Sequence, residues 1–188
     1  MKKKVLVILG HPQPQSYCGA LADAYRDGAR EAAADVRVLT LAALELAPAA
    51  GGSEPSPDVR RAQDDIRWAE HLVFVYPILW GTIPALLKAF IERSFLPGFA
   101  VNFREGALGW DRLLAGRSAR LIVTMNTPPW LYRWMFGRPG HNTMKRAILK
   151  FSGVTPVRIS QFGPVNRSNA VQRSRWLDAV RALGRRVA

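Results

Sequence analysis

The chain has 188 residues and a mass of 20.9 kDa, with 48% hydrophobic and 22% charged residues, a composition that excludes a disordered chain and a low-complexity fibre. No stretch approaches the ~18 apolar residues of a membrane-spanning helix, and the five apolar residues Val5 to Leu9 are too few for the core of a signal peptide. The single cysteine, Cys18, excludes an internal disulfide and a cysteine metal cage. We therefore expect one domain over residues 1–188, in the cytoplasm and without a metal site.

The positive charge is concentrated in the second half of the chain. Residues 1–94 carry 11 basic and 11 acidic side chains, whereas residues 95–188 carry 16 basic and 3 acidic ones. Nucleic acid, an anionic cofactor, an acidic protein or a membrane surface would each explain this excess. An arginine-rich composition that only aids solubility would explain it equally well.

Apolar runs alternate with amphipathic stretches along the chain. Strands are expected at residues 4–9, 36–41, 72–76, 119–125 and 157–162, and helices at 18–34, 57–70, 83–94, 142–151 and from 168 onward. Residues 42–57 and 126–140 are expected to be loops, and 95–114 irregular structure. Ser56 and Thr82 are the expected N-caps of the second and third helices. Alternating strands and helices predict an α/β fold, a parallel sheet with helices on both faces.

The polarity of the strands predicts their order in the sheet. Residues 5–9, 72–75 and 121–123 are continuous apolar runs, which are typical of the buried middle of a parallel sheet. The second and fifth strands alternate with polar residues such as Arg37 and Arg158, as edge strands do. The order 2-1-3-4-5 puts those two strands at the edges, whereas the Rossmann order 3-2-1-4-5 would bury the second strand. The pattern therefore predicts a flavodoxin-like, five-stranded sheet.

In such a sheet a ligand binds beyond the carboxyl ends of the strands, where the strand order reverses. The first loop there, residues 10–18, lacks the glycine patterns of NAD-binding Rossmann domains and of P-loop NTPases. It leads into the N-terminus of a helix, which attracts anions, and Ser16 and His11 are the candidate hydrogen-bond donors. Ser16 would otherwise only cap the helix, and His11 would only fix the turn.

The loop after the third strand, residues 76–84, is apolar where polar residues are usual. Ile78, Leu79 and Trp80 stand at the expected mouth of the sheet. A flat aromatic ligand would explain their placement. Packing of Trp80 on the following helix would explain it as well.

Two motifs at these loops identify a resemblance. Residues 6–12 read Leu-Val-Ile-Leu-Gly-His-Pro, followed by Ser16 and Tyr17, and residues 76–80 read Tyr-Pro-Ile-Leu-Trp, followed by Pro-Ala-Leu-Leu-Lys at 84–88. This pairing resembles the flavodoxin-like NAD(P)H:quinone oxidoreductases, and residues 99–108 look like their short hairpin. The resemblance covers almost the whole chain. A relative within that family is the ancillary flavoprotein of a glutathione-gated potassium efflux system.

The resemblance implies a bound flavin, FMN or FAD, that takes hydride from NAD(P)H and passes it to a quinone or similar electrophilic acceptor in ping-pong order. By motif position, the phosphate end would be held by His11, Ser16, Tyr17 and Cys18. One side of the isoalloxazine would be walled by Pro77, Ile78, Leu79 and Trp80. The pyrimidine edge would be bound, largely through backbone, by Thr124, Met125, Asn126 and Thr127.

The chain departs from the family after the fourth expected strand. Many relatives have Thr-Thr-Gly-Gly there, whereas residues 124–129 read Thr-Met-Asn-Thr-Pro-Pro, and two prolines change the backbone path that glycines allow. Relatives then place a tyrosine and a histidine over the flavin. Tyr132 matches in spacing, and His141 comes a few residues late. Their implied role is to orient the acceptor and to stabilise charge during hydride transfer, although His141 would equally be a helix-start residue.

Four aromatic residues crowd residues 130–136, which predicts a lid, a subunit interface or both. The family forms homodimers with the site near the interface, so the resemblance implies a homodimer. Aromatic residues next to Arg133 and Arg138 would also suit stacking on single-stranded nucleic acid, but no nucleic-acid-binding fold is recognised. Cys18 would be reactive only with His11 as a base, and a structural role is favoured.

The leading hypothesis is a flavin-dependent NAD(P)H oxidoreductase. The alternative is a flavoprotein regulatory subunit whose basic second half binds an acidic partner, such as a potassium efflux system. A yellow colour on purification would separate both from a nucleic-acid binder, and activity without any partner would favour the enzyme.

Overall fold

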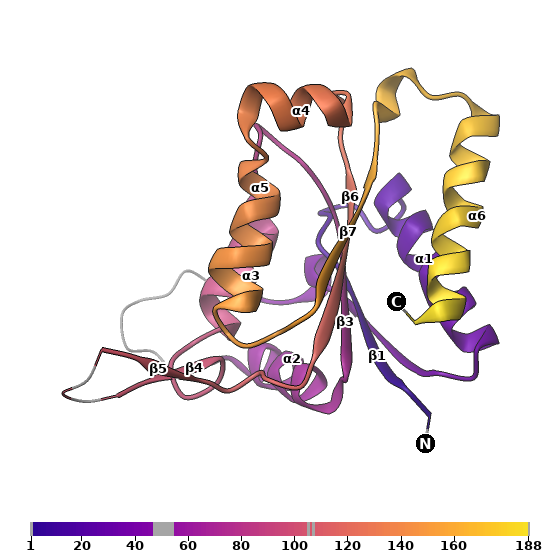
Figure 1. Cartoon of the computed structure of the whole chain (residues 1–188). Coiled ribbons are helices and arrows are strands. Elements are labelled where there is room, and N and C mark those ends of the chain that lie inside the picture. Colours follow the sequence, from indigo (N-terminus) through magenta and orange to yellow (C-terminus); the bar gives the residue numbers. More distant parts are fainter. Residues whose placement is uncertain (1, 47–54, 105, 107, 188) are drawn as a thin grey trace.

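The fold is taken from a computed structural model that describes residues 2–46, 55–104, 106 and 108–187 (Figure 1). One parallel sheet is formed by β1 (Lys4–Leu9), β2 (Asp35–Thr40), β3 (His71–Pro77), β6 (Ser118–Thr124) and β7 (Val157–Phe162). Its strand order is β2-β1-β3-β6-β7. Two short strands, β4 (Val101–Phe103) and β5 (Trp110–Arg112), pair separately as an antiparallel hairpin that projects from the body of the molecule (Figure 1).

The observed strand order, β2-β1-β3-β6-β7, differs from the predicted 2-1-3-4-5 in the numbers of its last two strands. The prediction counted five strands and left residues 95–114 irregular, but the hairpin of β4 and β5 lies in that segment, so the last two sheet strands are β6 and β7. All seven residues of β3 are buried, while β2 and β7 at the edges carry exposed side chains. This burial follows from position, because a central strand is covered on both faces.

Helices cover both faces of the sheet (Figure 1). One face is covered by α1 (Tyr17–Glu31) and α6 (Ala170–Arg186). The other is covered by α2 (Pro57–Trp68), α3 (Ala85–Ser94), α5 (Pro139–Asn142) and the π-helical turn η2 (Thr143–Lys150) that continues α5. Helix α4 (Pro129–Phe136) lies across the carboxyl end of the sheet. Short 3-10 turns occupy Leu41–Ala43 and Val165–Arg167.

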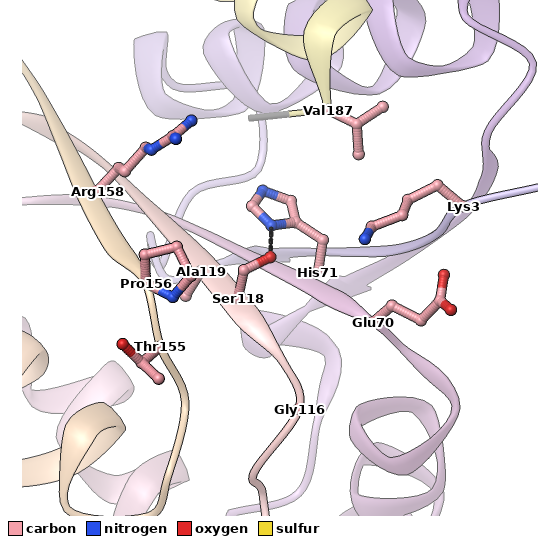
Figure 2. A pocket seen from close by; sticks show the side chains of 10 residues that line it. All are labelled: Lys3, Glu70, His71, Gly116, Ser118, Ala119, Thr155, Pro156, Arg158 and Val187. Carbon is pink, nitrogen blue, oxygen red and sulfur yellow. Dashed lines mark hydrogen bonds between the residues drawn. The ribbon is translucent and has the colours of Figure 1, made fainter.

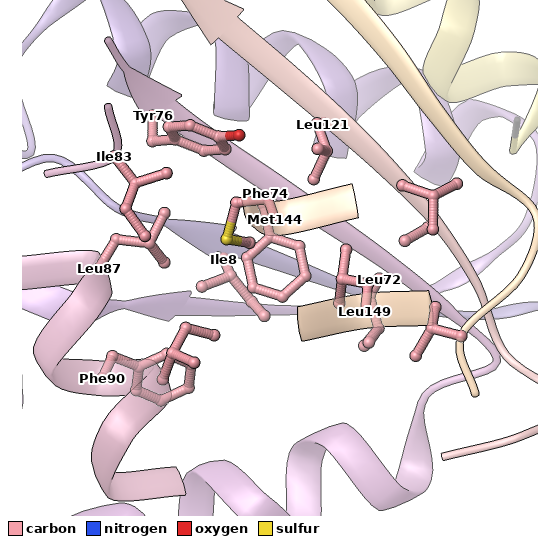
Figure 3. Packing of buried hydrophobic residues seen from close by; sticks show 14 of the residues in the cluster. Ile8, Leu72, Phe74, Tyr76, Ile83, Leu87, Phe90, Leu121, Met144 and Leu149 are labelled. Atoms are coloured by element: carbon pink, nitrogen blue, oxygen red, sulfur yellow. The ribbon is translucent and has the colours of Figure 1, made fainter. Parts of the chain in front are cut away.

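The core has one layer on each side of the sheet. In the layer drawn in Figure 3, Ile8, Leu72 and Phe74 of the strands pack against side chains of α3 and η2, such as Phe90 and Leu149. The second layer joins β1, β3 and β6 to α1 and α6. Burial of each large apolar side chain stabilises the fold by ~1.5–3 kcal/mol. No helix in the described ranges is long and apolar enough to cross a membrane.

Two of the local predictions can be checked at helix ends. Ser56 is confirmed as the N-cap of α2, because its side chain accepts a hydrogen bond of 3.3 Å from the Val59 amide. The prediction for Thr82 is wrong: α3 begins at Ala85, after Pro84, and makes no side-chain cap bond. Thr82 instead pairs with Leu79 across a tight turn.

The predicted loop at 126–140 is also wrong in part, because it contains α4 and the start of α5. Pro129 at the first helical position, where no intrahelical N–H is needed, explains why the two prolines do not prevent this helix. Some predicted segments fall outside the described residues: the chain ends at 1 and 188, residues 47–54 of the predicted loop, and residues 105 and 107 of the hairpin.

Candidate functional site

Two cavities adjoin at the carboxyl end of the sheet. The smaller measures about 230 Å³ and the larger about 650 Å³. They share four lining residues, Ile78, Leu79, Met125 and Asn126, which follow β3 and β6. The smaller cavity is further lined by His11, Tyr17, Cys18, Pro77, Thr124 and Val165. The larger one is further lined by Trp80, Gly81, Thr127, Tyr132 and Phe136.

The loop after β1 brings the N-terminus of α1 to the smaller cavity. Ser16 is the N-cap, and its Oγ accepts a hydrogen bond of 3.3 Å from the Gly19 amide. Gly19 allows the loop to fold tightly over the helix, since a Cβ there would lie 1.8 Å from the Pro14 carbonyl oxygen. Within the described chain the amides of Tyr17 and Cys18 have no hydrogen-bond acceptor, and the first turn has no acidic residue. This end of α1 therefore carries free N–H groups and the positive end of the helix dipole.

His11 lines the same cavity in a fixed orientation. Its Nδ1 accepts a hydrogen bond of 2.9 Å from the Gln13 amide. In the neutral ring the proton therefore lies on Nε2, which is left as a donor.

Cys18 is buried and is held as a thiol. Its Sγ lies 3.2 Å from Thr124 Oγ1, which joins α1 to the end of β6. Burial raises the pKa of Cys18 to about 11. A thiol with that pKa is protonated at neutral pH, so the structural role expected for Cys18 fits and a nucleophilic role does not.

The loop after β3 forms a tight turn at the larger cavity. The amide of Ile78 donates to the Thr124 carbonyl at 2.7 Å, which ties this loop to β6. Leu79 and Thr82 then exchange two backbone hydrogen bonds of 3.0 Å each. Between them, Trp80 and Gly81 have φ of +50° and +77°, as a type I′ turn requires. The turn presents the Trp80 side chain fully exposed at the cavity, so Trp80 does not pack on the following helix.

Helix α4 borders the larger cavity, and Tyr132 is its buried residue. Trp130, Trp134, Met135 and Phe136 are exposed, whereas the relative exposure of Tyr132 is 1%. The Tyr132 hydroxyl donates to the Gly81 carbonyl at 2.8 Å and accepts from the Gly140 amide at 3.0 Å. Burial raises the pKa of Tyr132. The hydroxyl thus holds together α4, the Trp80 turn and α5.

His141 is not brought to either cavity. It lies behind Tyr132, with ring centroids 5.2 Å apart, and its relative exposure is 2%. Neither ring nitrogen has a hydrogen-bond partner among the described residues. Burial lowers the pKa of His141. Its burial therefore favours the neutral ring, and His141 lines neither cavity.

The backbone beyond β6 is largely engaged within the protein. The Thr124 carbonyl accepts from Ile78, the Met125 amide donates to the Phe162 carbonyl at 3.0 Å, and the Met125 carbonyl accepts from Val165 at 3.0 Å. Asn126 uses its side-chain oxygen to accept from the Asn166 amide at 3.2 Å. Polar contacts to a ligand at this edge are thus left mainly to the backbone of Asn126 and to Thr127.

Of the residues that the resemblance assigns to the flavin and the acceptor, all but Ser16 and His141 line one of the two cavities. Sequence reasoning missed Gly81, Phe136 and Val165 as lining residues. Val165 follows the carboxyl end of β7, so the rule that ligands contact the loops after strands would have found it.

A third cavity, of about 340 Å³, lies at the opposite end of the sheet and is lined by none of these residues (Figure 2). His71 borders it, with Nδ1 2.7 Å from Ser118 Oγ. Burial, with nearby Arg120, lowers the pKa of His71 to about 4. No group of three or more potential metal-ligand side chains occurs in the ranges that the structure describes.

Comparison with known proteins gives concordant matches. A family model described as Flavodoxin-like fold matches residues 3–184. The chain is similar to a ribosyldihydronicotinamide dehydrogenase-like protein, traD, of Penicillium crustosum, with 29% identity over 65% of this chain and 57% of that protein. It is also similar to an FMN-dependent NADH:quinone oxidoreductase of Pseudomonas savastanoi, with 27% identity over 87% of this chain and 84% of the other.

The solved structure of Smu.1420 from Streptococcus mutans has a TM-score of 0.85 and 27% identity, covering 99% of this chain and 100% of that one. The chain spans 57% of the length of the Penicillium protein and 66% of the length of a similar ribosyldihydronicotinamide dehydrogenase of Homo sapiens.

Proposed function

The chain belongs to the Flavodoxin-like fold family, and from that premise we propose that it is a flavin-dependent NAD(P)H oxidoreductase that reduces a quinone or a similar electrophilic acceptor. The name of the Pseudomonas relative, an FMN-dependent NADH:quinone oxidoreductase, supports this proposal and favours FMN over FAD.

The observation that carries the proposal is the two-part cavity with one anion-attracting end and one apolar end. A flavin mononucleotide has the same division, with a phosphate at one end and a flat ring system at the other. The free amides of Tyr17 and Cys18 at the start of α1 suit the phosphate. Ile78, Leu79 and Met125 give the ring an apolar wall at the junction of the cavities. The residues present therefore fit this group.

A bound flavin would supply hydride transfer between two substrates that visit the site in turn, which is ping-pong chemistry. The protein's own residues bind and orient. His11 offers Nε2–H as a donor beside the α1 terminus. Asn126 and Thr127 provide the polar edge, and Trp80 and Phe136 border the open side, where a flat acceptor would stack.

We assign Tyr132 a positioning role. Both hydrogen-bonding directions of its hydroxyl are used, by the Gly81 carbonyl and the Gly140 amide. The hydroxyl therefore holds α4 in place above the larger cavity, where it forms the roof of the proposed acceptor site, and it also fixes the turn that carries Trp80. His141 packs against the Tyr132 ring and supports that roof from behind.

We also propose that the chain forms a homodimer. The exposed aromatic face of α4 would be covered by a second copy of the chain, which supports a homodimer with the cavity near the interface. The alternative function, a regulatory subunit that binds an acidic protein, is supported only by the basic second half of the chain.

The deciding experiment is to purify the full chain, record its absorbance spectrum, identify the released flavin and measure NAD(P)H oxidation with a quinone. We expect bound FMN and turnover with no partner added. A colourless protein that does not take up added flavin would contradict the proposal. Bound flavin with turnover only after an acidic partner is added would favour the regulatory alternative.

A further inference from the structure

Arg173 lies on the first turn of α6. It contacts two residues that line the smaller cavity, Tyr17 and Val165. Tyr17 donates its hydroxyl hydrogen to the Arg173 carbonyl at 3.0 Å, and the Arg173 guanidinium carbon lies 5.6 Å from the centroid of the Tyr17 ring. The Arg173 Nη2 donates to the carbonyl of Val165, the other lining residue, at 3.1 Å. The arginine therefore closes the gap between α1 and the loop after β7.

The guanidinium is held in place but not neutralised. Nε donates to Ser168 Oγ at 2.9 Å, so two of its nitrogens are fixed by neutral acceptors. Among the described residues no carboxylate lies within ion-pair distance of it, unlike Arg181 and Arg185 further along α6, which both pair with Glu31. A charge fixed in this way has already lost much of its side-chain entropy, which favours binding of an anion.

The segment that carries these contacts is itself anchored to the site. The Val165 amide donates to the Met125 carbonyl at 3.0 Å, and the Asn166 amide donates to the Asn126 side chain at 3.2 Å. The loop after β7 is thus tied to the loop after β6. The Arg173 guanidinium is therefore held against the ring of Tyr17, the first residue of α1, rather than being free to point away.

We propose that Arg173 is a cofactor-binding residue that pairs with the terminal phosphate of FMN at the N-terminus of α1. This inference rests on the proposed flavin function. A terminal phosphate carries close to two negative charges at neutral pH, and the fork of an arginine matches its oxygens. Two amides and one helix dipole provide partial positive charge, and Arg173 adds the full charge that they lack.

The test compares FMN with riboflavin, which has the same ring system and no phosphate. The full chain is freed of flavin, and the affinity for each ligand is measured by quenching of flavin fluorescence. We expect Arg173→Gln to weaken FMN binding about tenfold and riboflavin binding less than about twofold. Arg175→Gln is the matched control, because Arg175 is exposed on the same helix, and it should leave both affinities unchanged.

Salt gives a second readout. Added salt should weaken FMN binding to the unmodified protein more than to Arg173→Gln. Salt screens the charge of Arg173, which only the unmodified protein carries. An equal loss of both ligands would mean that Arg173 only supports the loop, and no loss would mean that it does not reach the phosphate; either result overturns the inference. An unmodified protein that binds neither ligand would overturn the proposed flavin function as well.

Discussion

Replacement of Tyr132 by phenylalanine removes one oxygen atom that joins three segments above the larger cavity. The hydroxyl donates to the Gly81 carbonyl and accepts from the Gly140 amide. Gly140 is buried, so its amide would lose its acceptor without gaining water, which costs ~1–3 kcal/mol. Gly81 is only half-buried, and its carbonyl can accept from water instead. We expect Tyr132→Phe to lower the free energy of unfolding by about 2 kcal/mol.

For a domain of this size that loss corresponds to a fall in Tm of ~4–8 °C. Thermal and urea unfolding would measure it. Tyr17→Phe is the matched control, since its hydroxyl donates to an exposed carbonyl, and we expect a loss below ~1 kcal/mol. In steady-state kinetics Tyr132→Phe should lower turnover with quinone more than it lowers flavin content, with the larger change in KM for the acceptor, because the roof of the acceptor site is loosened. Unchanged stability together with a collapse of kcat would refute a positioning role and assign the hydroxyl to the chemistry.

Three other outcomes are expected. Trp80→Ala should weaken flavin retention or hydride transfer and leave the fold intact, since the side chain is fully exposed; full flavin occupancy with normal NAD(P)H oxidation would contradict this. If exposed Arg133 or half-buried Arg138 binds the 2′-phosphate of NADPH, the enzyme should prefer NADPH to NADH and lose part of that preference at high salt. Equal kcat/KM values for NADH and NADPH at low salt would mean that these arginines do not bind the 2′-phosphate. The native state should lose about 3 kcal/mol between pH 6.5 and 4, because the lowered pKa of His71, about 4, means that only the unfolded chain takes up this proton in that range. Urea titrations of His71→Phe across that range should have a shallower pH dependence, and an unchanged slope would rule out His71 as the cause.

The amino-acid pattern alone predicts the five strands of the parallel sheet and the end of that sheet at which the candidate site lies. A continuous apolar run predicted β1 with the bounds Lys4–Leu9, and an alternation of apolar and polar residues predicted β7 with the bounds Val157–Phe162, because the hydrophobic pattern of a strand is local in sequence. Chain direction then fixed the loops that could meet a ligand, since all carboxyl ends of a parallel sheet lie at one edge. For that reason residues of three distant segments, His11, Trp80 and Thr124, line two adjoining cavities at this edge.

The sequence did not predict the cover of the site. The sequence predicts a loop where α4 lies, because the apolar side chains of this helix are mostly exposed and do not form the one-sided pattern by which a helix is recognised in a sequence. The residue type of Thr82 predicts an N-cap, but the backbone of Thr82 pairs with Leu79 across the turn instead. Residue type alone does not show which of two competing hydrogen bonds a segment will form.

The surroundings of the remaining candidates depend on contacts between segments that lie far apart in the sequence. His141 is suitable for acid–base chemistry by type, yet it is buried behind Tyr132 and faces neither cavity. The Tyr132 hydroxyl contacts residues 51 and 8 positions away in the sequence, and Arg173 contacts Tyr17 across 156 positions. Such contacts depend on how helices pack on the two faces of the sheet, and this packing is set by the sum of many side-chain interactions rather than by any local pattern.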